Sequence, residues 1–327
     1  MDIRTALFDW RERHALDARA AARLEQLAGL RGEPPGLARR LPLGVAVLGI
    51  ALLGFGLILW IAANWDTLSR AGRFALLQGV VLVALAGALL RPALRAPLAL
   101  LGFLGIGGLF AYFGQTYQTG ADPWQLFALW ATLALPLALA VRSDLLWAPW
   151  ALVAAVAISL WVQAHTGHSW RVLPDDLRVH LAGWGAALAL VGCLSAPLRG
   201  HTGAGPWALR TALTLTITGI SATALGGLFG STVTLPYPLG LLVLAAMVAA
   251  LALRDAFDIY GLSAAALGLN VLLIAGLARL LFHHHSGGEP IGQLLLLGLV
   301  AAGLLAGSVS GVLRLARQRA GADGEGA

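Results

Sequence analysis

Ten apolar runs alternate with short polar segments along most of the chain. They lie at about residues 43–63, 74–90, 97–113, 124–141, 145–164, 179–196, 208–229, 236–253, 257–282 and 291–313. An α-helix of about twenty apolar residues crosses the hydrocarbon core of a bilayer, and most of these runs approach that length. The pattern therefore predicts an all-α, polytopic integral membrane helix bundle of about ten transmembrane helices.

The two ends of the chain are polar. In residues 1–42 the apolar side chains Leu16, Ala20, Leu24 and Leu27 recur at helical spacing, and Asp17 can cap the start of that helix. We therefore expect a cytosolic amphipathic helical segment over 1–42, the transmembrane bundle over 43–313 and a cytosolic disordered tail over 314–327. The first segment could dock a partner or lie on the membrane, and packing against the protein's own loops is the favoured use.

Composition agrees with this class. Hydrophobic residues make up 58% of the 327 residues and charged residues 12%, at a mean hydropathy of +0.79. All 22 basic residues are arginine, and they flank the apolar runs rather than forming one patch. Such charge orients membrane helices, so nucleic acid is not an expected partner. The single cysteine, Cys193, lies in an apolar run and is expected to be a packing thiol.

The arginines divide unequally between the two sides. If successive loops alternate across the membrane, seventeen arginines share a side with both termini and five lie on the other side. Arginine accumulates on the cytoplasmic side, so the sequence predicts that both termini are cytoplasmic. The other side is called the outer side below.

Polar residues follow the first and third runs on the outer side. Each set combines an amide, an aromatic side chain and a carboxylate. The first set is Asn64, Trp65, Asp66 and Arg73, and the second is Gln115, Tyr117 and Asp122. If the two loops meet, these seven residues could surround one polar, ligand-binding cavity. The equally supported alternative is that the same groups tie two loops together by hydrogen bonds.

Histidines cluster in two other outer loops. The four metal-ligand candidates are His165, His168, His283 and His285, and Asp175 or Glu289 could complete a zinc or copper site with them. Adjacent histidines point in different directions, so solvated loop histidines are the favoured interpretation. We expect no metal and no other cofactor.

The apolar runs contain few polar side chains. Asn270 lies near the middle of the ninth run, and no Asp, Glu or Lys lies deep in any run, which argues against ion-coupled transport through a midplane carboxylate. No nucleotide-binding or hydrolase motif occurs. In the last run Gly303, Gly307 and Gly311 form a close-packing face, which could serve homo-oligomerisation or contact another helix of the same chain.

Several short motifs carry a family resemblance. They are Ala62-Ala-Asn-Trp65, Gly114-Gln-Thr-Tyr117, Leu129-Trp130, Leu135-Pro136 and Arg142-Ser143. With them the chain resembles, over about residues 10–160, a bacterial family of predicted membrane proteins, domain of unknown function 2157. The resemblance implies a short cytosolic helical segment before a multi-span bundle, in the bacterial inner membrane. It implies no activity and no functional residue.

Three functions remain open. The favoured one is binding or transport of a small polar solute or lipid headgroup from the outer side, with membrane lipids as the surrounding partners. The second is a membrane scaffold or regulator that acts through the N-terminal helices. The third is a membrane enzyme that uses outer Asp and His residues on lipid-linked substrates, although the sequence favours a protein that is not an enzyme.

Overall fold

The computed structural model describes residues 7, 10, 13–14, 16–28, 37–64, 67–117, 120, 122–167, 172–230, 232–253, 257–283 and 290–324. The chain divides into two compact units, Met1–Trp60 and Ile61–Ala327.

The first unit contains α2 (Ala18–Leu27) and most of α3 (Leu37–Ala63). As predicted, Asp17 caps α2, because its Oδ1 accepts a hydrogen bond from the N–H of Ala20 at 2.7 Å. No residue of α2 is buried, and Leu27 is 79% exposed. Leu16, Ala20 and Leu24 are half-buried, so the described residues cover the amphipathic face of this helix only in part.

The second unit is a series of helices. They are α4 (Arg70–Leu90), α5 (Arg95–Tyr117), α6 (Pro123–Val141), α7 (Asp144–His165), α8 (Leu177–Leu194), α9 (Arg199–Thr202), α10 (Pro206–Leu228), α11 (Pro236–Leu251), α12 (Ile259–His283) and α13 (Pro290–Gly324). Short 3-10 turns, η1 (Pro92–Leu94), η2 (Pro174–Asp176) and η3 (Ala196–Leu198), precede α5, α8 and α9.

A helix covers each of the ten predicted apolar runs. Among the described residues, eight helical stretches are long and apolar enough to cross a membrane. The other two are α11, which has 16 residues, and α3, in which the apolar stretch Gly44–Gly54 is shorter. The prediction of an all-helical, polytopic membrane protein is confirmed.

One predicted boundary differs. The sequence pattern placed a disordered tail from residue 314, whereas α13 continues to Gly324. Arginine, alanine and glutamine favour helix, so the polar continuation extends the apolar helix without a break. The side chain of Arg319 also donates a hydrogen bond to the carbonyl of Ala252 and lies 5.1 Å from the ring of Phe257, which holds this part of α13 against the α11–α12 connection.

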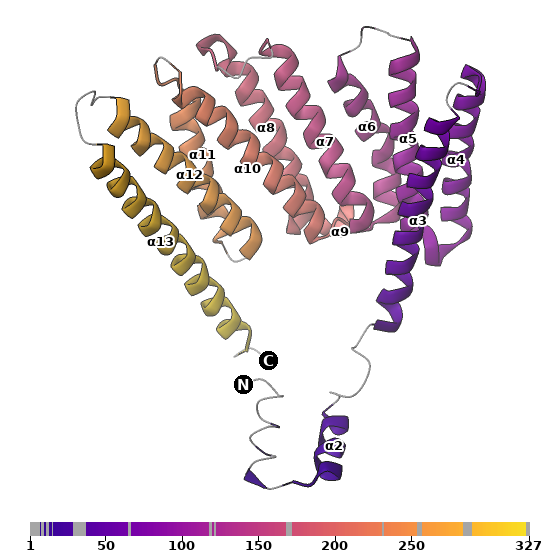
Figure 1. Cartoon of the computed structure of the whole chain (residues 1–327), viewed down its shortest axis with the longest axis horizontal. Coiled ribbons are helices and arrows are strands. Elements are labelled where there is room, and N and C mark those ends of the chain that lie inside the picture. Colours follow the sequence, from indigo (N-terminus) through magenta and orange to yellow (C-terminus); the bar gives the residue numbers. More distant parts are fainter. Residues whose placement is uncertain are drawn as a thin grey trace. The chain divides into compact units, whose positions relative to one another are not determined.

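Neighbouring helices follow chain order at the start of the second unit and then gather around α10. In Figure 1, α4, α5, α6 and α7 lie side by side, and the contacts of α10 are with α7, α8, α11 and α12. Helix α13 packs on α12. The side chains of α10 are the most buried of any candidate span, because four helices surround it.

Charged side chains from other helices satisfy both ends of α10. At its start, Asp144 accepts hydrogen bonds from the N–H groups of Gly205, Trp207 and Ala208 at 3.1, 2.7 and 2.9 Å. At its end, Arg279 donates to the carbonyls of Leu228 and Gly230. A carboxylate at the N-terminus and a cation at the C-terminus also match the helix dipole.

Two glycines allow the loop before α10 to approach α7. Gly203 has φ +71°, and a Cβ there would lie 2.5 Å from the Arg142 Cβ. A Cβ on Gly205 would lie 2.6 Å from the Asp144 carboxylate carbon. Only glycine leaves room for this contact. Trp147 of α7 also holds the loop by donating its Nε1–H to the Thr202 carbonyl at 3.0 Å.

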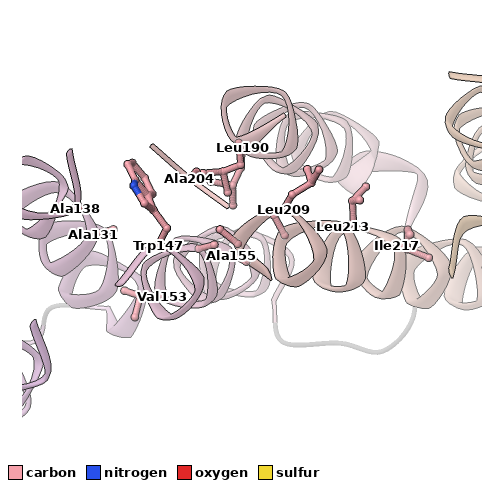
Figure 2. Close-up of a cluster of buried hydrophobic side chains, with 14 of the residues drawn as sticks. Ala131, Ala138, Trp147, Val153, Ala155, Leu190, Ala204, Leu209, Leu213 and Ile217 are labelled. Carbon is pink, nitrogen blue, oxygen red and sulfur yellow. The ribbon is translucent and has the colours of Figure 1, made fainter. Parts of the chain in front are cut away.

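The core runs through the middle of the second unit. Figure 2 shows Leu209, Leu213 and Ile217 following one another along α10, with Leu190 of α8 beside them and Trp147 and Ala155 on α7. Alanine fills many of the contacts, including Ala131, Ala138 and Ala204 in the same view. Lipid tails are as apolar as the helices, so the hydrophobic effect does not drive helices together inside a membrane. Small side chains let the helices approach closely, and the van der Waals contacts between them stabilise the bundle instead.

Contacts between helix ends establish the alternation of loops in this unit. Arg142, directly after α6, donates to the carbonyl of Gly200, which follows α8. Arg210, near the start of α10, pairs with Asp258, which follows α11. The loops after α6, α8 and α11 therefore lie at the same end of the unit. Arg279 joins the ends of α12 and α10 at the opposite end. The first end corresponds to the predicted cytoplasmic side and the second to the predicted outer side.

Candidate functional site

A cavity of about 440 Å³ lies between α7, α8 and α10. Its polar lining consists of Ser159, Gln163, His180, Trp184, Thr216 and Thr223, and the remainder is apolar or glycine. Such a size and a mainly apolar wall with a few polar groups are typical of small-molecule sites. His180 and Gln163 lie near the ends of α8 and α7 that the arginine distribution assigns to the outer side.

Helix α8 contributes the two buried nitrogens of the cavity. His180 and Trp184 are one helical turn apart and are 7% and 6% exposed. Neither the Nδ1 of His180 nor the Nε1 of Trp184 has a hydrogen-bond partner among the described residues. One turn earlier, the Oδ2 of Asp176 is also buried without a partner, although Asp176 does not line the cavity.

Helices α7 and α10 form the other walls. A Cβ on Gly183 would lie 2.4 Å from the Val162 Cγ2, so this glycine lets α8 and α7 approach closely beside the cavity. On α10, Thr216 donates to the carbonyl of Ala187 at 3.4 Å and Thr223 donates to that of Gly219 at 3.0 Å. Both hydroxyl oxygens retain lone pairs that can accept a further hydrogen bond.

The lining can hold a small molecule by hydrogen bonding. Trp184 can only donate, His180 Nδ1 can donate or accept, and Ser159 and Gln163 can do both. More than nine-tenths of buried polar groups in proteins find partners, and an ionisable side chain inside a membrane span marks a functional site by default. The two unpartnered nitrogens therefore make this cavity the strongest candidate site in the described part of the chain.

The seven residues predicted from the outer loops are only partly described. Trp65 and Asp66 lie outside the described residues. Asn64 directly follows α3, and its backbone carbonyl accepts from the Thr67 hydroxyl at 2.9 Å. Arg73 is half-buried in the first turn of α4, which begins after the Ser69 cap. The shared cavity remains a prediction.

The members of the second set on α5 face different neighbours. Gln115 lines a cavity of about 350 Å³ against Trp130 of α6. Tyr117 instead lies against Phe74 of α4, with ring centroids 6.1 Å apart. Asp122 is exposed at the N-cap of α6 and makes no capping hydrogen bond. Gln115 and Tyr117 are therefore directed towards different helices.

Of the four histidines considered as metal ligands, His168 and His285 lie outside the described residues, and the side chain of His283 does as well. The Nδ1 of His165 lies 2.8 Å from the carbonyl oxygen of Trp161, and its ring packs on Trp161 and Trp124 at 4.8 and 6.2 Å. His165 thus belongs to an aromatic cluster at the end of α7 that is predicted to face the outer side.

The polar residue predicted within the ninth run forms a contact between helices. Asn270 is 4% exposed and exchanges hydrogen bonds with Ser308 of α13 at 2.9 and 3.3 Å. On the same helix, Gly303, Gly307 and Gly311 have no described atom within 4 Å of an added Cβ. The glycine face of α13 therefore does not pack against α12.

Sequence reasoning missed His180 and Trp184. The sequence does contain the relevant pattern: His180 and Trp184 are four residues apart in one apolar run, and Ser159 and Gln163 are four residues apart in another. Four residues separate neighbours on one helical face, so each pair can line a common wall. The sequence alone does not state which helices face each other, and that pairing creates the cavity.

A family model described as "Predicted membrane protein (DUF2157)" matches residues 8–147. The resemblance drawn from the sequence motifs is confirmed over this region, which ends at the start of α7. No curated protein and no solved structure matches the chain. All residues that line the cavity between α7, α8 and α10 therefore lie beyond the matched region.

Proposed function

We propose that this protein is an inner-membrane protein of bacteria, with both termini cytoplasmic, that binds a small polar solute from the outer side in the cavity between α7, α8 and α10. The observation that carries the proposal is the pair of buried, unpartnered nitrogens, His180 Nδ1 and Trp184 Nε1, in that cavity. A bound solute would supply the missing partners.

The lining limits the class of solute. It must carry a hydrogen-bond acceptor, because Trp184 Nε1 can only donate. It must be small, since the cavity measures about 440 Å³, and partly apolar, because alanine, isoleucine and leucine side chains form most of the wall. No Arg or Lys lines the cavity, so a neutral solute with hydroxyl, carbonyl or amide groups fits better than an anion.

Substitution of Trp184 by phenylalanine tests the proposal, because it removes the N–H and retains most of the ring. In the ligand-free protein the change should be neutral or stabilising, since it removes a buried donor that has no partner. In protein purified gently from its membrane, native mass spectrometry should detect a small molecule in the wild type and much less of it in Trp184→Phe. His180→Leu should behave in the same way.

Trp150→Phe is the matched control. Trp150 donates its Nε1–H to the Ala131 carbonyl at 2.8 Å and lies outside the cavity. Its loss should lower stability by about 1 kcal/mol and leave solute retention unchanged. A wild-type protein that retains no solute, together with a Trp184→Phe variant destabilised like the control, would contradict the proposal.

The N-terminal helix supports a second candidate function. No residue of α2 is buried among the described residues and Leu27 is 79% exposed, so α2 could bind a cytoplasmic protein as a scaffold. The pair Leu24→Asp and Leu27→Asp would abolish such binding in pull-down experiments. It should not change solute retention, which separates the two candidates.

A further inference from the structure

A second cavity, of about 660 Å³, lies at the predicted cytoplasmic end of the second unit, between α8, α10 and α11. Its lining reaches from Ser195 back to Leu188 on α8, from Pro206 to Leu213 on α10 and from Leu251 back to Val243 on α11. The ends of these ranges are seven or eight residues apart, which corresponds to about 10–12 Å along each helix axis. The cavity is therefore a slot that runs along the helices from the membrane surface inward.

The two ends of the slot differ in polarity. The inner part contains only apolar side chains, among them Leu188, Leu213 and Val243, whereas the charged residues Arg199 and Asp258 line the end at the membrane surface. Trp207, next to this end, is 66% exposed, and exposed tryptophans lie at the level of the lipid headgroups. The slot is thus apolar at acyl-chain depth and charged at headgroup depth.

The negative charge at the mouth is already neutralised. The NH2 and Nε of Arg210 donate to the two carboxylate oxygens of Asp258 at 2.8 and 3.4 Å, and the Gly261 N–H adds a hydrogen bond of 2.9 Å. Two planar groups paired in this way form a strong, directional ion pair. Arg199 acts on Asp258 through its charge, because Arg210 and the Gly261 N–H supply the hydrogen bonds to this carboxylate.

Arg199 is the other charged residue of the lining. Its Nε is buried and has no hydrogen-bond partner among the described residues. With Arg210 and Asp258 compensating each other, the described residues at the mouth leave a net positive charge, from Arg199 and from Arg319, whose guanidinium lies 5.1 Å from the ring of the lining residue Phe257. A buried guanidinium N–H beside an apolar slot is complementary to an anionic acceptor that is attached to an apolar chain.

We propose that this slot binds one anionic phospholipid of the surrounding bilayer, with its phosphate on Arg199 and an acyl chain along α8, α10 and α11. The cytoplasmic leaflet of a membrane is rich in anionic lipid, which agrees with the predicted side of this cavity. The lipid site and the solute site lie at opposite ends of α10 and use different residues, so either proposal can fail without the other.

The test measures lipid retained on the full-length protein in a neutral detergent after incubation with equal amounts of phosphatidylglycerol and phosphatidylcholine. Native mass spectrometry should show one retained phosphatidylglycerol, preferred about fivefold or more over phosphatidylcholine. Arg199→Gln should reduce this preference to nearly one. Arg95→Gln, which removes an exposed arginine from the same predicted side but outside the slot, should leave the preference unchanged.

A second variant and a soluble anion separate the lipid from free phosphate. Ala246→Phe fills the apolar part of the slot and should abolish phosphatidylglycerol retention although Arg199 is intact. Inorganic phosphate at millimolar concentration should not displace the lipid. Equal retention of both lipids in the wild type, no effect of Arg199→Gln, or displacement by phosphate alone would each overturn the proposal.

Discussion

Asp144 provides the sharpest test of how this fold is held together. Its carboxylate lies at the start of α7 and accepts three main-chain N–H groups from the start of α10, at 2.7 to 3.1 Å. Substitution by alanine leaves these donors without their acceptor and removes a negative charge from the helix N-terminus. N-cap losses cost about 0.5–2 kcal/mol and hydrogen bonds to charged groups more, so we expect a destabilisation of about 2–4 kcal/mol.

The assay is reversible unfolding in mixed micelles by titration with a denaturing detergent. Asp144→Asn retains one acceptor oxygen and should lose about half as much stability as Asp144→Ala. The control is Asp122→Ala, because Asp122 also occupies an N-cap position but makes no capping hydrogen bond. Equal stability of Asp144→Ala and Asp122→Ala would refute the conclusion that Asp144 holds α7 and α10 together.

Two other predictions follow from the charged residues. Burial raises the pKa of Asp258, but hydrogen bonds from Arg210 and the Gly261 N–H outweigh burial and hold that pKa below its ordinary value. The stability from this pair is present above an ordinary aspartate pKa and is lost as the pH falls through the lowered pKa, so the difference in thermal stability between wild type and Asp258→Asn should shrink below about pH 4. For topology, reporter fusions after Arg142 and after His285 should report cytoplasmic and outer locations respectively, and the same location for both would contradict the alternation of loops.

Local patterns in the sequence predicted the helices well. Each apolar run is helical because a chain in lipid must satisfy its backbone internally. Asp17 caps α2, and Asn270 bonds across to α13, as a polar amide in a span usually does. The end of α13 was less predictable, because arginine and alanine favour helix whether or not membrane surrounds them.

Contacts between distant segments could not be predicted. Asp144 caps a helix that begins more than sixty residues later, and Arg199 lies over a slot formed by three helices. The polar residues of the outer loops were the binding residues predicted from the sequence, yet two of them, Gln115 and Tyr117, are directed to different helices. His180 did not stand out, because a single histidine in an apolar run has meaning only through the side chains that face it.

The most direct test of solute binding is an experimental structure of the protein in lipid nanodiscs, at a resolution that distinguishes ligands from water. One small molecule should give continuous density between α7, α8 and α10, within hydrogen-bond distance of both His180 Nδ1 and Trp184 Nε1. A cavity that contains only water, or a Trp184 Nε1 that donates to a protein carbonyl, would contradict it.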